Sequence, residues 1–364
     1  MRRPNEIDFW RGFALVTIFI NHVPGLFYER FTHRNFSLSD SAELFVFLAG
    51  WSLRFVVNIE ARASVVRLTA RLLGRAVSIY AAQILITMLA LAVIAFGALH
   101  FDAPLLLDWH NAGPVFQDPV ETHIGLVLLT HQLGYFNILP LYVVLMTAAP
   151  IFAILDRQSP WLLLAASGGL WLAALISGVN IPTWPMEGRW FFDPLCWQFI
   201  FVLGFLAGDD KRLGAMLRRI QPWARWAALP IVSLGAAAAA ANWSPDPLKV
   251  PWPPLLFIFD KTFLSPARVI QFCALAICVA GLYRHLPGWF AGITAYLAML
   301  GRNSLNVFCV ASVLSLAAQI MRFAWGGSFA TDTIVLITGL LAMGLSAWVS
   351  EWRDRFGVAS SSQR

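Results

Sequence analysis

The chain has 364 residues, of which 59% are hydrophobic and 13% are charged, and its formal net charge is +6. Soluble domains usually carry about 25% charged residues, so this composition excludes an ordinary soluble protein and indicates a chain whose solvent is lipid. The basic side chains are scattered between apolar runs, which argues against a nucleic-acid-binding surface. The four cysteines lie in apolar stretches without the spacing of metal ligands, so we expect no metal site. We also expect no permanently bound cofactor.

Ten apolar runs approach the length of about 20 residues that a helix needs to cross a bilayer. They cover residues 12–28, 41–57, 76–99, 135–155, 161–178, 194–208, 223–241, 264–283, 303–322 and 331–350. Each run must satisfy its own backbone hydrogen bonds in lipid, which favours helices. The sequence therefore predicts an all-α, polytopic membrane protein, with a single domain over 1–357 and a disordered cytoplasmic tail over 358–364. A shorter apolar stretch, 289–300, could add an eleventh helix.

Most of the 26 Lys and Arg residues fall on one side of the membrane if the N-terminus is cytoplasmic and the ten runs alternate in direction. This orientation obeys the positive-inside rule, and the opposite one would invert it. We therefore expect both termini to lie in the cytoplasm. The N-terminus has the basic and apolar parts of a signal peptide, but ionisable residues interrupt the apolar part and no small-residue cleavage site follows. It is expected to remain as the first helix.

The first predicted helix carries three ionisable residues, Asp8, Arg11 and His22. In a helix Arg11 and His22 would lie on nearly the same face, about 16 Å apart along the axis. Arg11 would then lie at the cytoplasmic edge and His22 roughly halfway across the bilayer. A histidine can accept and return a proton near neutral pH, so His22 is a candidate general base. The alternative is that His22 only donates a hydrogen bond to a neighbouring helix.

Asp40 and Glu43 stand at the predicted outer end of the second helix. Their spacing fits a capping box, in which Asp40 caps the helix and Glu43 is the third helical residue. The functional alternative is that one of them orients His22 or contacts an acceptor sugar, and Asp8 is a second candidate for orienting His22. Trp109, in the outer segment 100–133, is another candidate for sugar binding, although tryptophan is enriched at membrane interfaces in general.

Arg67, Arg71 and Arg75 are each four residues apart, so they share one face at the predicted cytoplasmic end of the third helix. Guanidinium groups bind phosphate well, and these arginines could hold the phosphates of an acyl-CoA whose arm reaches His22. The alternative is that they only anchor the helix by the positive-inside rule. The sequence contains no P-loop and no G-x-S-x-G, which argues against an ATPase or a hydrolase.

The R-x10-H spacing of Arg11 and His22, with the stretch ELFVFLAG on the second helix, resembles the membrane acyltransferase-3 superfamily. Further blocks along the chain are similar to the OpgC family, the succinyltransferases of osmoregulated periplasmic glucans. These blocks are 7–25, 31–50, 132–146, 192–205 and 300–308. The resemblance implies succinyl transfer from cytoplasmic succinyl-CoA to glucose hydroxyls of a periplasmic glucan, with His22 as the base and Arg11 in the donor site. The superfamily's R-x-x-R pair appears here as R-x-x-x-R, at Arg71 and Arg75.

Together these features predict direct transfer, in which His22 takes the proton of a sugar hydroxyl as the hydroxyl attacks the thioester carbonyl. Asn21, Asn303 and Ser304 are candidate donors to the oxyanion, and Asn303 is also a candidate for substrate binding. The expected partners are the lipid bilayer, the acyl-CoA donor and the glucan acceptor, without nucleic acid, and a homo-oligomer stays open. An O-acetyltransferase of another envelope glycan, a glucan or solute transporter and a structural subunit are the alternatives.

Overall fold

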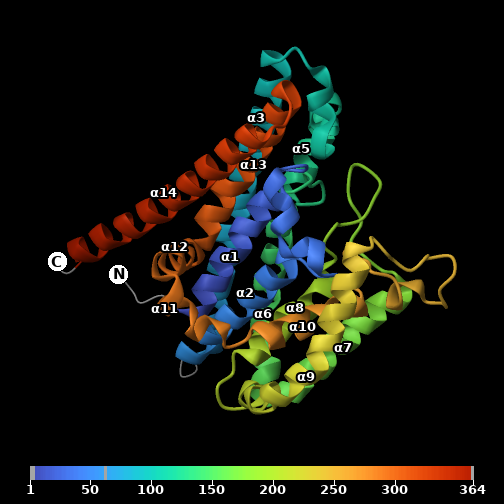
Figure 1. The fold of residues 1–364 in the computed structure, drawn as a ribbon, viewed down its shortest axis with the longest axis vertical. Coiled ribbons are helices and arrows are strands. Elements are labelled where there is room, and N and C mark those ends of the chain that lie inside the picture. Colours follow the sequence, from blue (N-terminus) through green and yellow to red (C-terminus); the bar gives the residue numbers. More distant parts are fainter. Residues whose placement is uncertain (1–4, 61–63, 362–364) are drawn as a thin grey trace. The chain divides into compact units, whose positions relative to one another are not determined.

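The computed structural model of the protein describes residues 5–60 and 64–361. Within these residues the chain forms α-helices and short 3-10 helices, and its only strand-like pairing is a single β-bridge between Pro182 and Arg189. Figure 1 shows the helices coloured along the chain. The predicted all-α fold is confirmed.

The α-helices are α1 (Glu6–Asn21), α2 (Ser41–Ile59), α3 (Val65–His100), α4 (Gly113–Gln117), α5 (Pro119–Val127), α6 (Ile138–Gln158), α7 (Pro160–Ser177), α8 (Pro194–Ala207), α9 (Leu213–Ala240), α10 (Pro266–Val279), α11 (Leu286–Trp289), α12 (Ala291–Arg302), α13 (Ser304–Trp325) and α14 (Phe329–Ser361). The 3-10 helices are η1 (Phe27–Phe31), η2 (His33–Phe36), η3 (Pro104–Asn111), η4 (Pro254–Leu256) and η5 (Leu282–Arg284). The last helix enters the segment predicted to be a tail, and residues 362–364 lie outside the described part.

Eight helices in the described part of the chain are long and apolar enough to cross a membrane. They are α2, α3, α6, α7, α9, α13, α14 and the helical segment Pro266–Arg284, which comprises α10 and η5. Each corresponds to one of the ten predicted runs, and the other two runs correspond to the shorter helices α1 and α8, of 16 and 14 residues. The protein is therefore a polytopic membrane protein. The stretch 289–300 forms most of α12, which has 12 residues and is too short to span by itself.

The first helix differs from its predicted bounds of 12–28 at both ends. It begins earlier, at Glu6, because the side chain of Asn5 accepts a hydrogen bond from the backbone N–H of Asp8 at 2.8 Å and caps the helix. It stops at Asn21 because Pro24 has no N–H to continue the helix and Gly25 adopts a left-handed φ of 78°. His22 is consequently the residue that closes α1 rather than one in its interior.

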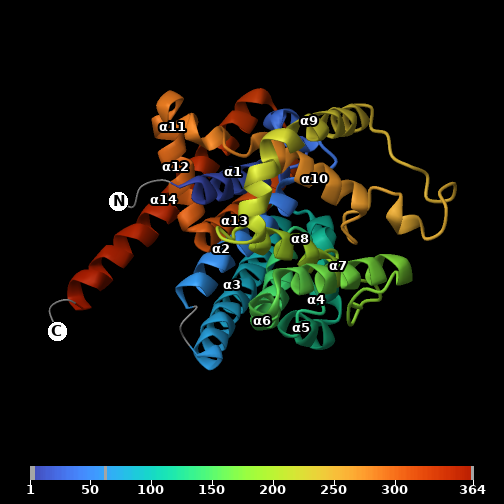
Figure 2. The ribbon, with the colours of Figure 1, turned by 90° about the horizontal axis from the view of Figure 1, so that it is seen from below.

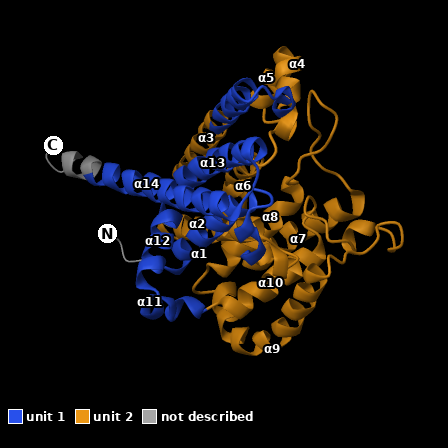
Figure 3. Cartoon of the chain, turned by 45° about the horizontal axis from the view of Figure 1, so that its top comes forward, with its two compact units in different colours: residues 1–32, 86–107, 281–364 blue, residues 33–85, 108–280 orange. Residues whose placement is uncertain are grey.

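The chain divides into two compact units, which are coloured separately in Figure 3. Unit 1 comprises residues 1–32, 86–107 and 281–364, and unit 2 comprises residues 33–85 and 108–280.

In unit 1, α1 runs beside α12 at very close range, as Figures 1 and 2 show. Two glycines make this possible, one on each helix. A Cβ atom on Gly12 would lie 1.9 Å from the carbonyl oxygen of Leu297, and one on Gly301 would lie 1.8 Å from that of Asp8. Small residues at a helix contact let the two backbones approach, which is how helices associate strongly where lipid provides no hydrophobic drive.

Unit 2 uses the same arrangement between α2 and α8. A Cβ atom on Gly50 or on Gly204 would lie 1.9 Å from a backbone oxygen of the other helix, that of Phe201 or Phe47. Most of α8 is buried, including the large side chains of Trp197, Phe201 and Phe205. The two predicted runs that became short helices, α1 and α8, are thus the helices in the tightest backbone contact within their units.

Candidate functional site

Arg11 lies on α1 in unit 1, and its guanidinium contacts the first residue of α13. The Nη2 atom of Arg11 donates to the hydroxyl oxygen of Ser304 at 2.5 Å. Ser304 is buried, and Asn303 directly before it donates its side-chain amide to the carbonyl oxygen of Met299 at 3.0 Å. The structure therefore brings the predicted residues Arg11 and Ser304 together, and it uses the Asn303 amide to close the end of α12.

His22 closes the other end of α1. Its backbone N–H donates to Ile18 at 2.9 Å, which completes the last turn of the helix. Its backbone carbonyl accepts a hydrogen bond at 2.5 Å from Nε2 of Gln319, which also lies on α13. A single helix, α13, thus contacts α1 at both residues of the predicted pair.

The turn that follows His22 is fastened to α13 and α14. Arg322 donates to the carbonyl oxygen of Gly25 at 2.9 Å and forms an ion pair with the buried side chain of Asp332. The carboxylate of Asp332 also accepts the backbone N–H of Phe27 at 2.7 Å. Every one of these residues belongs to unit 1, and the contacts fix the backbone from His22 to Phe27.

Asp8 lies in the first turn of α1, about 21 Å along the helix axis from His22. Its carbonyl oxygen is the backbone atom that Gly301 approaches. Asn21, next to His22, is buried, and its Oδ1 atom accepts a hydrogen bond from the hydroxyl of Thr32 at 2.8 Å. The NH2 group of Asn21 is therefore the part of this side chain that could donate to an oxyanion.

Asp40 and Glu43 form the predicted capping box at the start of α2 in unit 2. Asp40 accepts the backbone N–H of Ala42 at 2.8 Å, and Glu43 accepts the backbone N–H of Asp40 at 3.0 Å. The capping interpretation is confirmed. Glu43 is also fully buried, and its other oxygen accepts from Arg268 of α10 at 2.7 Å.

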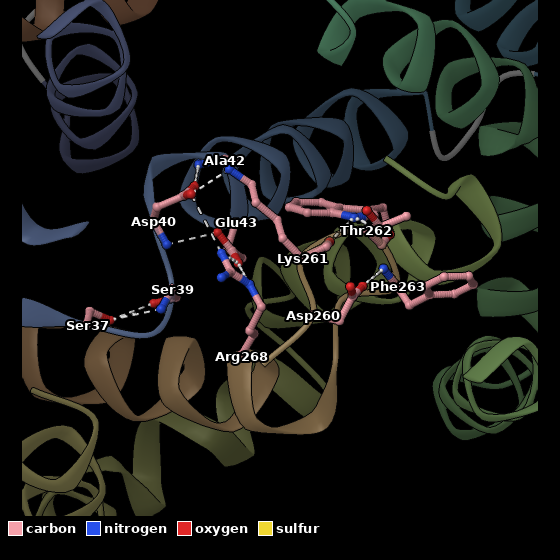
Figure 4. Close-up of polar contacts among 11 residues, drawn as sticks. Ser37, Ser39, Asp40, Ala42, Glu43, Asp260, Lys261, Thr262, Phe263 and Arg268 are labelled. Carbon is pink, nitrogen blue, oxygen red and sulfur yellow. Dashed lines mark hydrogen bonds and ion pairs between the residues drawn. The ribbon is translucent and has the colours of Figure 1, made fainter. Parts of the chain in front are cut away.

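A second cation joins this group, so that two carboxylates face two cations, as Figure 4 shows. The Nζ atom of Lys261 lies 2.5 Å from the carboxylate of Asp40, and Arg268 lies 3.6 Å from it. Burial by itself would raise the pKa of Asp40, but the nearby charges of Lys261 and Arg268 outweigh it and hold the pKa well below its ordinary value. Asp40 is therefore an anion throughout the physiological pH range.

Lys261 is contacted at its backbone and at its ammonium group. The indole N–H of Trp197 donates to the backbone oxygen of Lys261 at 3.1 Å, and the ammonium lies 5.7 and 5.6 Å from the rings of Phe191 and Phe192. Sequence reasoning missed Lys261 and Arg268. Arg268 carried a usable signal, because it is a charged residue inside a predicted membrane run.

The other predicted binding residues of unit 2 lie in two places. Arg67, Arg71 and Arg75 are exposed on α3, and Arg71 forms an ion pair of 2.5 Å with Glu60 at the end of α2. Trp109 is partly exposed at a kink in η3, with its ring centre 5.8 Å from that of His110.

Unit 2 also contains a buried ion cluster that the sequence did not reveal. Arg54 of α2 donates to Asp156 of α6 at 2.5 Å and to Asp209, in the turn after α8, at 2.6 Å. The guanidinium lies 4.8 Å from the ring centre of Phe205. The cluster ties three elements of unit 2 together. In the described part of the chain no group of three or more His, Cys, Asp or Glu side chains could hold a metal ion.

Comparison with known proteins gives one match that covers nearly the whole chain. A family model described as OpgC protein matches residues 3–355. Neither the curated proteins nor the solved structures gave a match.

Proposed function

Because the chain belongs to the OpgC family, we propose that it transfers a succinyl group from cytoplasmic succinyl-CoA to glucose hydroxyls of a periplasmic glucan. Family membership indicates a glucan-modifying acyltransferase, and the membrane-length helices make it a membrane enzyme. The succinyl group, its CoA carrier, the cytoplasmic side of the donor and the periplasmic side of the glucan are our proposals beyond family membership. We also propose the bacterial inner membrane as its location.

One observation carries the proposal: Arg11 lies on α1, His22 closes the same helix, and α13 contacts both of them. The two residues are about 16 Å apart along the axis of α1. A donor with a charged head and a thin arm fits such a spacing, with its head near Arg11 and its thioester near His22. CoA thioesters have this form.

In the proposed reaction His22 accepts the proton of a glucose hydroxyl while the oxygen attacks the thioester carbonyl. The tetrahedral oxyanion then collapses, the C–S bond breaks, and the leaving thiolate takes the proton back from His22. The products are a glucosyl succinate ester and CoA thiol, so the protons balance within the site. A general base of this kind contributes about 10²–10⁴-fold to the rate.

Further contacts of the substrates are also proposals. Arg67, Arg71 and Arg75 would bind the donor phosphates. Arg71 would then give up its ion pair with Glu60 and pair with a phosphate instead. Such a pair contributes only about 0–1 kcal/mol, so a phosphate can replace it at little cost. Asp40, Trp109 and Asn303 would contact the acceptor, and Asn21 and Ser304 would stabilise the oxyanion.

The proposal is tested with purified protein in lipid nanodiscs, unmodified glucan, and either succinyl-CoA or acetyl-CoA. We expect release of CoA thiol that requires the glucan, a matching mass increase of the glucan, and a rate at least about 10-fold higher with succinyl-CoA. Faster reaction with acetyl-CoA would make the protein an acetyltransferase. No thiol release with either donor, combined with glucan uptake into proteoliposomes, would favour the transporter.

A further inference from the structure

The backbone carbonyl of His22 lies at the end of α1, where no N–H of the helix can donate a hydrogen bond to it. The last four carbonyl groups of an α-helix have no partner within the helix. At the end of α1 the carbonyl of Ile18 is taken by His22 and that of Ile20 by Val23. The carbonyl of His22 accepts instead from Gln319, a residue 297 positions away in the sequence.

This bond determines how the His22 backbone is oriented. His22 has φ −85° and ψ 2°, outside the helical geometry of α1, so the helix itself does not define its ψ angle. A hydrogen bond to the carbonyl oxygen fixes the peptide plane after His22. The N–H of His22 is already fixed by its hydrogen bond to Ile18. With the peptide groups on both sides of His22 fixed, the direction of its Cα–Cβ bond is fixed too, and the imidazole starts from a defined position.

Arg322 and Asp332 support the same turn from neighbouring positions. Arg322 lies one helical turn beyond Gln319 on α13 and holds the carbonyl of Gly25 at 2.9 Å. Asp332 holds the N–H of Phe27 at 2.7 Å and pairs with Arg322. Of these three residues, Gln319 is the one that donates a hydrogen bond to the backbone of His22 itself, so its loss should change the orientation of the imidazole most directly.

We propose that Gln319 is a positioning residue of the acyl transfer, which acts by fixing the backbone of His22. The inference rests on the proposed function, because it takes His22 to be the base. A base misplaced by about 1 Å can lose about 10²-fold in rate while substrate binding is unchanged. A residue that only stabilised the fold would not separate these two quantities in a folded variant.

The test measures kcat and both KM values in nanodiscs for the wild type, Gln319→Leu, Ser315→Ala and His22→Ala. Leu is close in volume to Gln but cannot donate to the His22 carbonyl. We expect Gln319→Leu to lower kcat by about 10- to 100-fold with both KM values within about 2-fold of wild type. Ser315 is the matched control, because it is buried on the same helix and its hydroxyl donates to the backbone carbonyl of Ser312 in that helix.

Gln319→Met keeps the inference testable if the Leu variant does not fold. Met has a similar length and shape to Gln but no N–H to donate to the His22 carbonyl. We expect the same selective fall in kcat, with both KM values within about 2-fold of wild type. A wild-type kcat in a folded Gln319→Met protein would overturn the positioning role.

The outcomes separate the inference from the proposed function. If His22→Ala is inactive but Gln319→Leu keeps the wild-type kcat, the positioning role is overturned and the base assignment stands. If Gln319→Leu raises a KM without lowering kcat, Gln319 binds substrate and does not position the base. If His22→Ala is as active as wild type, the base assignment falls and the positioning role falls with it.

Discussion

Glu43 has both carboxylate oxygens engaged inside unit 2, one by Arg268 and the other by the backbone N–H of Asp40. Removing one partner of a buried ion pair costs about 3–5 kcal/mol, because a charge is left unpaired in a medium of low polarity. Loss of activity in Glu43→Ala would therefore report on the folding of unit 2 as well as on chemistry. His22 and Gln319 are better positions for testing the mechanism.

Asp193 offers a pH-dependent test at the same scale. It caps α8 by accepting the N–H of Leu195 at 3.1 Å, it is fully buried, and burial raises its pKa to about 6. The folded state therefore holds this proton more tightly than the unfolded chain, whose aspartate has a pKa of about 3.9. The stabilisation is complete below about pH 4 and is lost as the pH rises through 6, with a size on the order of 1–3 kcal/mol.

Asp193→Asn keeps a side-chain oxygen that can cap α8 and removes the titrating proton. We predict that the variant gains thermal stability relative to wild type between pH 4 and pH 7, because only the wild type loses protonation energy over that range. Tryptophan fluorescence during heating in detergent measures the two Tm values. A difference in Tm that is the same at pH 4 and pH 7 would show that Asp193 does not titrate in this range.

At the scale of helices, the apolar runs predicted which segments are helical, because the need to satisfy backbone groups in lipid acts locally. They did not predict the ends of α1, where the run continues to residue 28 but Pro24 and Gly25 stop the helix. The capping box of Asp40 and Glu43 was predictable, since both partners lie within one turn. Hydropathy alone does not detect such local signals.

The partners of the site residues could not be predicted in the same way. Gln319 lies 297 residues from His22, and Arg268 lies 225 residues from Glu43. A hydrogen bond over such a separation depends on which helices pack together, and neither periodicity nor composition specifies that. Family resemblance pointed to Arg11 and His22 but did not point to the residues that hold them.

The glycine contacts give a prediction for the helix pair α1 and α12. Gly301→Ala places a Cβ atom where the backbone oxygen of Asp8 lies, so the two helices must separate. We expect a destabilisation of about 1–3 kcal/mol, seen as a lower Tm in detergent, together with reduced transferase activity because α1 carries Arg11 and His22.

Gly292→Ala is the matched control on the same helix. A Cβ atom at Gly292 would meet nothing within 4 Å, and alanine favours a helix over glycine by about 1 kcal/mol. This control should be as stable as wild type or more so. Equal Tm values for the two alanine variants would mean that α1 and α12 do not pack through Gly301.

At the scale of the whole molecule, the predicted topology has an even number of crossings and both termini in the cytoplasm. A reporter that is active only in the cytoplasm should therefore be active when fused after Arg364, and one that is active only in the periplasm should be inactive there. The positive-inside distribution of Lys and Arg is the physical reason. The reverse pattern of activities would require an odd number of crossings.

The central claim is that His22 is the base of a glucan succinyltransferase. Its most direct test is mass spectrometry of periplasmic glucans from cells that lack this gene and carry the wild type, His22→Ala or His123→Ala at matched membrane levels. His123 is an exposed histidine whose ring contacts the carbonyl of Pro119 in its own helix, so it controls for loss of any imidazole. We predict succinylated glucan with the wild type and His123→Ala, and none with His22→Ala. Equal succinylation in all three strains would contradict the role of His22, and its absence from all three would contradict the reaction itself.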